Sequence, residues 1–265
     1  MSKDDLKFSP DETDLDKQLI HDLNRLYEDD SSGRESVRNT RFFKVASILT
    51  ILIFLALVFN NWLMIIRLPS LDFLERSREL TRDPKLRTLR EAVVEIHTGN
   101  SRGTGFNIAA DGIIITNYHV VKNAASAQVN FIGERTYTGV IAALYPEIDL
   151  AVVSVKEEDL PAIEVETDSE MSAGDSVTII GNPLWFSGVI IEGEVLGKTV
   201  LQGWDVPVLL IRAPVHKGNS GSPVLNSRGK AGAVIFATSV VKNGEKEEII
   251  GLAVPLSNLN KEVVR

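Results

Sequence analysis

The sequence contains no cysteine, and this absence excludes disulfides, cysteine–zinc sites and thiol catalysis. Histidine is scarce as well: there are four, and no two of them have the spacing of metal ligands. The basic surface that nucleic-acid binding needs is also missing, because the formal net charge is -8. We therefore expect a protein with no metal, no other cofactor and no nucleic-acid partner.

The acidic charge is concentrated at the amino terminus. Residues 1–30 hold ten Asp or Glu against four Lys or Arg, and so carry most of the net charge. An acidic, aromatic-poor tail of this kind is usually solvated and disordered. We predict such a tail over residues 1–44, with a basic flank at its end. The rest of the chain, in a sequence that is 44% hydrophobic, is long enough for one sizeable domain.

A long apolar stretch runs from Val45 to Ile66. Its 22 residues are enough for a helix to cross the hydrocarbon core of a bilayer. A signal peptide is the alternative, but the stretch is too long and follows a charged leader of 44 residues. Basic residues flank it, with Arg38, Arg41 and Lys44 before it and Arg67 after it. We predict a single-pass transmembrane helix over 45–66, with the tail in the cytoplasm and the carboxyl-terminal domain on the periplasmic or extracellular side.

Residues 67–92 and 93–265 have different patterns. The first segment is charged with leucines at roughly helical intervals, which predicts a helical linker with a break at Pro84. The second segment alternates short apolar runs with Gly, Asn and Asp, and Asp111-Gly112 indicates a two-residue hairpin. This pattern predicts an all-β barrel or sandwich, followed by a short helix that Ser257 caps near the end of the chain. The predicted strands are 93–97, 105–108, 113–116, 127–131, 150–155, 176–180, 189–196, 208–211, 233–237 and 249–254.

Three residues point to nucleophilic catalysis. Ser220 lies in the glycine-rich turn Gly218–Pro223, where the backbone can bring successive N–H groups to one point. His119 ends one apolar run, and Asp149 begins another. Each is ordinary alone: a turn, a core histidine and a turn cap. Together, in the order His, Asp, Ser within one β-rich domain, they predict a serine activated by an imidazole that a carboxylate orients.

The segment from about Val93 to Arg265 resembles the protease domain of the HtrA/Deg family of trypsin-like serine proteases. The resemblance implies a chymotrypsin-like double β-barrel with the active site between the barrels. It rests on motifs in the family's order: Gly103–Phe106, Asp111–Asn117, His119–Val121, Asp149–Val152, Gly174-Asp175, Ile180–Pro183, Gly218–Gly221, Leu225–Gly229 and Gly251–Pro255.

The same resemblance implies a role for each site residue. Ser220 is similar to the family's nucleophile, His119 to its general base and then acid, and Asp149 to its orienting carboxylate. The backbone N–H groups of Gly218 and Ser220 would form the oxyanion hole. Loss of one donor from such a hole typically costs roughly 3 kcal/mol of transition-state stabilisation.

The sequence departs from the family at three places. His216-Lys217 stands where members usually carry Asn-Pro, and Ser222 replaces the usual second glycine beside the nucleophile. The chain ends without a PDZ domain, so we do not expect activation by PDZ capture of a peptide. We expect His216 to be a solvent-facing loop residue rather than the base. Gly103-Thr104-Gly105 is not interpreted as a phosphate loop, because no helix is expected to follow it.

Substrate preference is bounded on one side. Trypsin-like enzymes that cut after Lys or Arg have an aspartate six residues before the nucleophile, and this chain has Pro214 there. We therefore expect an aliphatic or small side chain in the primary pocket rather than a basic one. The resemblance implies that the substrate adds a strand along the edge 233–238, with Ala233, Ile235 and Ala237 as candidate substrate-binding residues.

The function we expect is that of a membrane-anchored serine endopeptidase acting on misfolded or regulatory proteins. The expected partners are a protein or peptide substrate and the lipid bilayer, and the resemblance makes a homotrimer plausible. The alternative is a latent or inactive protease-like binding or scaffold protein, because the residues at 216, 217 and 222 are altered. A fluorophosphonate probe separates the two, since it labels only a competent serine.

Overall fold

The computed structural model describes residues 17–25, 44–57, 72–99, 101–133, 136–243 and 246–259. The chain divides into two compact units, Met1–Pro69 and Ser70–Arg265. In the first unit, residues 17–25, within the tail expected to be disordered, form a helix, and residues 44–57 form another. No helix of the described residues has the length and apolar character needed to cross a membrane. Residues 58–66 of the expected transmembrane helix lie outside the described residues.

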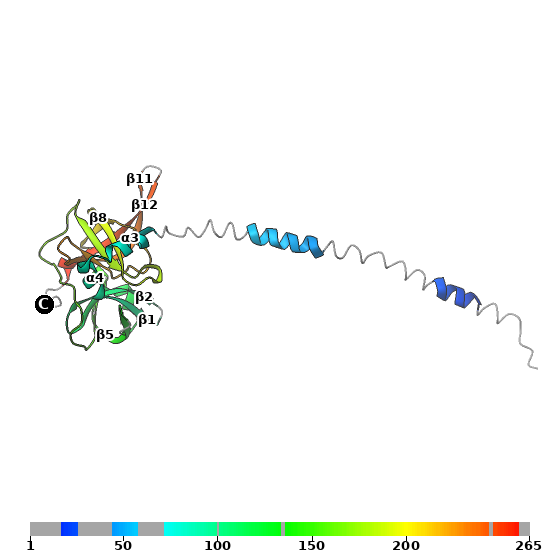
Figure 1. Cartoon of the computed structure of the whole chain (residues 1–265), viewed down its shortest axis with the longest axis horizontal. Coiled ribbons are helices and arrows are strands. Elements are labelled where there is room, and N and C mark those ends of the chain that lie inside the picture. The colour runs from blue at the N-terminus through cyan, green and yellow to red at the C-terminus, as the bar shows by residue number, and fades with distance from the viewer. Residues whose placement is uncertain are drawn as a thin grey trace, which may run out of the picture. The chain divides into compact units, whose positions relative to one another are not determined.

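The first barrel of the second unit closes in the strand order β1-β2-β3-β6-β5-β4, with every pair antiparallel. Figure 1 draws this barrel in green, with β1, β2 and β5 labelled. Closure is visible at Val94 of β1, which pairs with Gly105 on one side and Phe131 on the other. Its strands are β1 (Val93–Thr98), β2 (Ser101–Ala109), β3 (Ile113–Asn117), β4 (Ser126–Phe131), β5 (Thr136–Tyr145) and β6 (Leu150–Ser154).

The second barrel closes in the order β10-β11-β12-β9-β8-β7, also antiparallel throughout. Its strands are β7 (Ser176–Gly181), β8 (Val189–Val200), β9 (Pro207–Arg212), β10 (Pro223–Leu225), β11 (Ala231–Asn243) and β12 (Lys246–Pro255). The all-β, double-barrel fold expected from the sequence is therefore confirmed.

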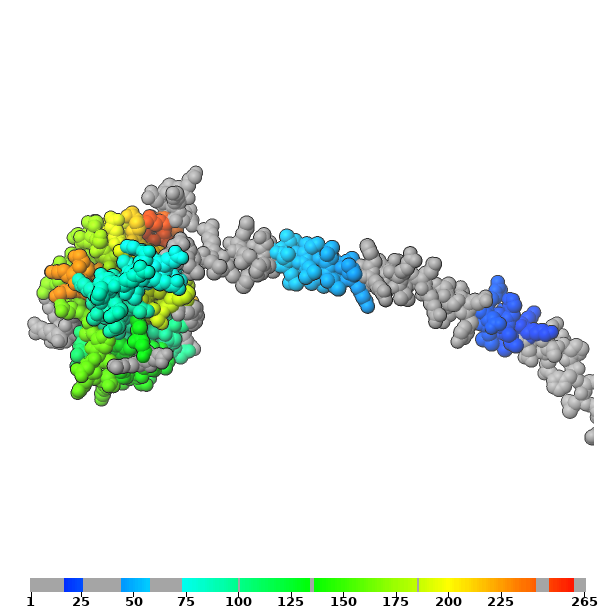
Figure 2. Space-filling model, viewed as in Figure 1, coloured from blue at the N-terminus to red at the C-terminus, as the bar shows by residue number. Residues whose placement is uncertain are grey.

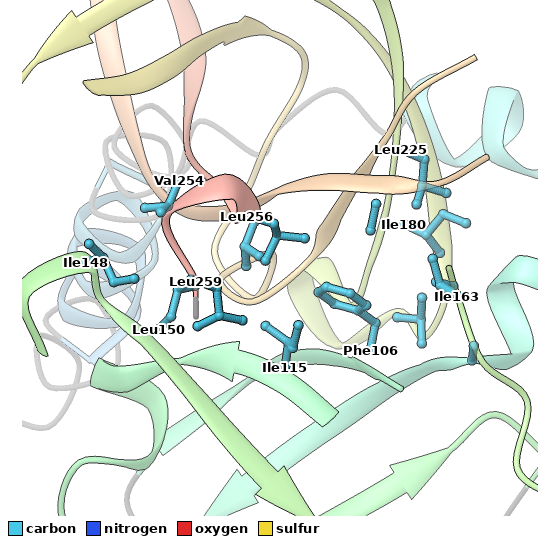
Figure 3. Close-up of a cluster of buried hydrophobic side chains, with 14 of the residues drawn as sticks. Phe106, Ile115, Ile148, Leu150, Ile163, Ile180, Leu225, Val254, Leu256 and Leu259 are labelled. Atoms are coloured by element: carbon cyan, nitrogen blue, oxygen red, sulfur yellow. The ribbon is translucent and has the colours of Figure 1, made fainter. Parts of the chain in front are cut away.

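Period-two alternation along the strands builds three apolar clusters. In β7, Ile179 belongs to the cluster inside the second barrel, and the next residue, Ile180, belongs to a cluster that draws on both barrels. In β3, Ile114 faces the interior of the first barrel and Ile115 the shared cluster. The shared cluster therefore joins the barrels, with Phe106, Ile115 and Leu150 from the first against Ile180, Leu225, Val254 and Leu256 from the carboxyl-terminal half (Figure 3).

The linker consists of two helices, α3 (Asp72–Leu80) and α4 (Pro84–Glu91). Pro84 occupies the first turn of α4, where a missing N–H breaks no helical bond, and Asp83 caps the helix by accepting a bond from Lys85 N at 2.8 Å. Both helices lie over one face of the barrels (Figure 2). Ser77 of α3 is buried, and its Oγ accepts a bond from Ile190 N of β8 at 2.8 Å. The linker is thus packed against the second barrel.

Two strands and one terminal element differ from expectation. Strands β5 and β10 were not predicted. At the carboxyl end, the described part is a 3₁₀ turn, η4 (Leu256–Asn258), which contains Ser257 instead of being capped by it. Residues 260–265 of the expected final helix lie outside the described residues.

Candidate active site

His119 and Asp149 are joined directly at one end of the first barrel. His119 lies in the one-turn helix α5 (Tyr118–Val121), which follows β3 at once, and Asp149 lies between the 3₁₀ turn η2 (Pro146–Ile148) and β6. The imidazole Nδ1 is 2.6 Å from Asp149 Oδ2, and the backbone N–H of His119 donates to Asp149 Oδ1 at 2.9 Å. Both carboxylate oxygens therefore hold the same residue.

The backbone of Asp149 is in the left-handed region, with φ 50° and ψ 37°. Aspartate tolerates this conformation better than most residues, but it still costs energy and persists only where the surroundings hold it. The carbonyl of Asp149 accepts bonds from Tyr118 N at 3.1 Å and from Asn117 Nδ2 at 2.9 Å. Since the imidazole side chain is 40% exposed and that of Asp149 only 15%, the pair presents the ring to solvent and keeps the carboxylate behind it.

Ser220 lies in a tight loop that follows residue 215 and ends at β10. Gly218 and Gly221 have φ of 104° and 90°, values that L side chains rarely adopt. At Gly221 a Cβ would collide with the carbonyl oxygen of Thr104 in β2, so the loop packs backbone against backbone on the first barrel. The loop is also bonded to the second barrel, because Gly221 N donates to Ile235 O at 2.8 Å.

The glycine in β2 that precedes Thr104 connects Ser220 with the His119 helix. A Cβ on Gly103 would meet Val120 Cγ2 at 2.7 Å and Ser220 O at 3.0 Å, so both neighbours flank the same point of β2. The hydroxyl of Ser220 donates to Phe236 O at 3.4 Å. Among the described residues, this carbonyl and not the imidazole is the hydrogen-bond partner of Ser220 Oγ.

Two peptide groups of the loop have a fixed direction. Lys217 O accepts a bond from Leu184 N at 3.0 Å, and Asn219 O accepts one from Ser222 N at 2.9 Å. In a trans peptide the N–H points opposite to the C=O of the same unit. The N–H groups of Gly218 and Ser220 therefore point away from those two donors, and neither has an acceptor among the described residues.

Comparison with known proteins shows what this chain is similar to. Residues 103–234, about half of the chain, match the trypsin-like peptidase domain. The chain carries a trypsin-like serine peptidase domain. It is 34% identical over 167 residues to a "probable periplasmic serine endoprotease DegP-like" of Chlamydia trachomatis, and 30% identical over 161 residues to a protein of the same description from Pseudomonas fluorescens.

These matches cover 62% and 60% of this chain but only 33% and 32% of those proteins, so the chain spans about a third of the length of the curated relatives. Solved structures share the fold. The inactive form of a serine-to-alanine mutant of Rv3671c from M. tuberculosis matches with a TM-score of 0.57 at 23% identity, over 66% of this chain and 86% of that one. A serine endoprotease of Yersinia pestis matches with a TM-score of 0.57 at 24% identity, over 68% and 65%.

The candidate substrate-binding residues of the protease domain lie in different environments. Pro214 is exposed and Ala237 is half-buried, whereas Ala233 and Ile235 are buried in the cluster inside the second barrel. Ile235 has two neighbours of interest: a Cβ on Gly251 would meet Ile235 Cδ1 at 3.2 Å and Val215 Cγ2 at 3.1 Å. Methyl groups of Val215 and Ile235 therefore both lie close to Gly251, where the absence of a side chain leaves room for them.

His216 is not the solvent-facing residue that we expected. Its ring is half-buried and lies 5.0 Å from the ring of Phe73 in α3, centroid to centroid, at an interplanar angle of 46°. Burial lowers the pKa of His216 below its ordinary value of 6.5. The expectation was wrong because no pattern in the sequence indicates that a helix of the linker, about 140 residues earlier, packs on this loop.

The altered residue at position 222 is accommodated by a buried polar contact. Ser222 is fully buried, and its Oγ lies 3.5 Å from Oδ1 of Asn219, which is also fully buried. Asn219 Nδ2 is the one atom of that amide without a partner among the described residues. The described residues also contain no group of three or more His, Asp or Glu that could hold a metal ion.

Proposed function

We propose that this protein is a membrane-anchored serine endopeptidase that uses Ser220 as nucleophile, His119 as base and Asp149 as the carboxylate that orients the imidazole. The observation that carries the proposal is the 2.6 Å contact between His119 Nδ1 and Asp149 Oδ2. A carboxylate on Nδ1 fixes the tautomer in which Nε2 is free to accept a proton. The exposed part of the ring is then the part available to the serine.

The reaction begins when Ser220 Oγ turns from Phe236 O toward His119 Nε2. His119 takes the hydroxyl proton as Oγ bonds to the substrate carbonyl carbon, and the carbonyl oxygen becomes an oxyanion. His119 then gives the proton to the leaving amine, the C–N bond breaks and an acyl-enzyme remains. Water then bonds to the acyl carbon as His119 takes its proton. The bond from that carbon to Ser220 Oγ breaks, and His119 returns the proton to Oγ.

The N–H groups of Gly218 and Ser220 are proposed to bind the oxyanion. Support comes from their direction, which the hydrogen-bonded carbonyls of Lys217 and Asn219 determine, and from the lack of any competing acceptor among the described residues. Donors that are already oriented stabilise developing charge without a reorganisation cost, which makes this effect one of the largest in acyl transfer.

We propose protein or peptide substrates with a small or aliphatic side chain before the cleaved bond. The contact of Val215 and Ile235 with Gly251 supports an apolar primary pocket, and no carboxylate occupies position 214. Beyond Phe236, one edge of β11 has no strand partner among the described residues, and this edge would pair with the substrate strand. A peptide-library digest tests this preference: cleavage after Val, Ile or Ala is expected, and efficient cleavage after Arg would contradict it.

Membrane anchoring by residues 45–66 is proposed from the length of the apolar stretch and its basic flanks. The relatives from Chlamydia trachomatis and Pseudomonas fluorescens are described as probable periplasmic proteases, and we propose the same side of the membrane for this protease domain. The expected result is that full-length protein resists alkaline extraction from membranes, and that added proteinase K reaches the domain only from the extracytoplasmic side. Release by alkali would refute the anchor.

The catalytic proposal is tested on full-length protein in detergent. The wild-type protein should react with a fluorophosphonate probe and hydrolyse casein, and Ser220→Ala should do neither. Ser227→Ala, a serine in the turn after β10, is the matched control and should behave as wild type. Equal hydrolysis by wild type and Ser220→Ala would disprove the proposal.

A latent form of the same enzyme has one observation in its favour. The Ser220 hydroxyl is bonded to Phe236 O, so the nucleophile is not joined to its base in this conformation. A latent enzyme would react slowly with the fluorophosphonate at rest and faster when a peptide pairs with β11 and occupies that carbonyl. A labelling rate that does not change across a series of added peptides would contradict latency.

A further inference from the structure

Thr104, a residue of the first barrel, makes two hydrogen bonds to the loop that carries Ser220. It is fully buried in β2 of the first barrel. Its Oγ1 donates to Gly218 O at 2.7 Å, and its backbone N–H donates to Ser220 O at 2.8 Å. One residue of the first barrel therefore holds two carbonyls of the loop that carries the nucleophile.

The threonine hydroxyl also reaches the second barrel. Its oxygen accepts the N–H of Asn182 at 3.0 Å while its proton is bonded to Gly218 O, so the hydroxyl both donates and accepts. The Asn182 side chain in turn bridges the barrels, because Nδ2 donates to Val94 O of β1 at 2.9 Å and Oδ1 accepts Gly188 N at 2.8 Å. Thr104 of the first barrel is thereby bonded both to the nucleophile loop and to Asn182, the residue that follows β7 of the second barrel.

The positions of these bonds matter for the oxyanion donors. Lys217 O is held by Leu184 N and Gly218 O by Thr104 Oγ1, so the peptide planes on both sides of the Gly218 Cα are fixed. The orientation of those two planes is described by φ and ψ of Gly218. Its φ is 104°, and because glycine adopts positive and negative φ with similar ease, the residue itself does not hold this conformation. Without the hydroxyl, the second plane loses its side-chain bond and is held only through Asn219 N, which donates to His216 O at 3.1 Å within the loop itself.

We infer that Thr104 is a positioning residue that keeps the loop in the conformation able to bind an oxyanion. Its hydroxyl does not touch substrate; it acts through Gly218 and, by its backbone N–H, through Ser220. The inference rests on the proposed function, since it assigns the residue that orients the proposed oxyanion donors.

The test compares variants at Thr104 in the full-length protein. Thr104→Val keeps the shape but loses the hydroxyl, and Thr104→Ser keeps the hydroxyl. Thr88→Val is the control, because Thr88 Oγ1 also bonds a carbonyl, that of Pro84 at 3.1 Å, within helix α4. We expect Thr104→Val to lower kcat for casein and the rate of fluorophosphonate labelling at least tenfold with KM within twofold, Thr104→Ser to stay within threefold of wild type, and Thr88→Val to match it.

Hydrogen exchange of the peptide 216–222 provides a readout that does not depend on activity. In Thr104→Val its amides should exchange at least tenfold faster, and in Thr104→Ser and Thr88→Val they should exchange as in wild type. If Thr104→Val does not fold, Thr104→Ala replaces it. The smaller side chain leaves room for water to bond Gly218 O and Asn182 N, the two groups that lose the hydroxyl. Unchanged kcat and unchanged exchange in a folded hydroxyl-free variant would overturn the inference. A wild type that does not react with the probe, but whose loop still responds to Thr104→Val, would refute the proposed function and leave the positioning role standing.

Discussion

The two halves of the candidate site are held by different kinds of interaction. His119 and Asp149 are fixed by side-chain bonds within one barrel, between segments that lie 30 residues apart. The Ser220 loop is fixed by bonds to its backbone carbonyls. The donors of these bonds come from both barrels, and one of them, Thr104, lies more than 100 positions earlier in the chain. Chemistry in the first half depends on residue type, whereas in the second it depends on the placement of the backbone. Mutations should therefore affect the halves in different ways.

The acid–base half should be most sensitive to Asp149→Asn. The amide can still accept the His119 backbone N–H, but its NH₂ group would face Nδ1 and favour the wrong tautomer. We expect kcat to fall by about 10⁴-fold, which is the loss seen when an orienting aspartate of a serine protease is changed in this way. The melting temperature should change little by comparison. Asp111→Asn, in an exposed turn, is the control, and a loss of less than tenfold in Asp149→Asn would show that Asp149 does not orient the base.

The nucleophile half should be most sensitive to Gly221→Ala. The added methyl group would collide with Thr104 O while the residue is held at φ 90°. We expect a loss of about 4 kcal/mol in the free energy of unfolding, measured with urea, together with loss of fluorophosphonate labelling.

Gly174→Ala separates the two causes of that loss. Gly174 has almost the same φ, 92°, but a Cβ there would meet nothing within 4 Å. Its cost should be the left-handed strain alone, about 1 kcal/mol. If the two variants lose the same free energy, the close approach of the barrels at Gly221 contributes nothing.

The sequence predicts the acid–base half better than the nucleophile half for a physical reason. Strands such as β3 and β7 contain continuous or alternating apolar residues, because they face two clusters at once, and this periodicity is readable. The motif containing His119 follows β3 directly, so its place in the fold could be predicted. Strand β5 was missed because Gly139 interrupts it and is its one buried residue, while the others alternate between exposed and half-buried, so the strand lacks the fully buried apolar face by which the other strands are recognised.

The supports of the Ser220 loop could not be predicted for a different reason. Thr104 lies in a motif that the sequence highlighted, but its partners, Gly218 and Asn182, are set by the docking of two barrels. Phe73 belongs to a helix that looked like a spacer, and it is buried on His216. Contacts of this kind depend on tertiary packing and leave no periodic signal in one sequence.

The contact of α3 with the loop is tested by Phe73→Ala. Phe73 is buried in the cluster inside the second barrel and packs on the ring of His216. Removal of a buried phenyl ring should lower the free energy of unfolding by about 3 kcal/mol and slow fluorophosphonate labelling, because the loop loses the support of the helix. Phe73→Leu, which keeps most of the apolar volume, should lose less than half as much. Faster labelling in Phe73→Ala would mean instead that α3 restrains the enzyme.

The smallest expected effect concerns pH and again distinguishes the two halves. Burial against Phe73 lowers the pKa of His216, so the unfolded chain binds a proton at a higher pH than the folded chain does. The contribution of neutral His216 to stability is therefore fully present above the ordinary pKa of 6.5 and is lost as the pH falls from there through the lowered value. In wild type the free energy of unfolding should decline over this range by more than in His216→Asn, which cannot take up the proton. If the free energy of unfolding has the same pH dependence in the two proteins between pH 7 and pH 5, protonation of His216 does not affect the stability of the Ser220 loop.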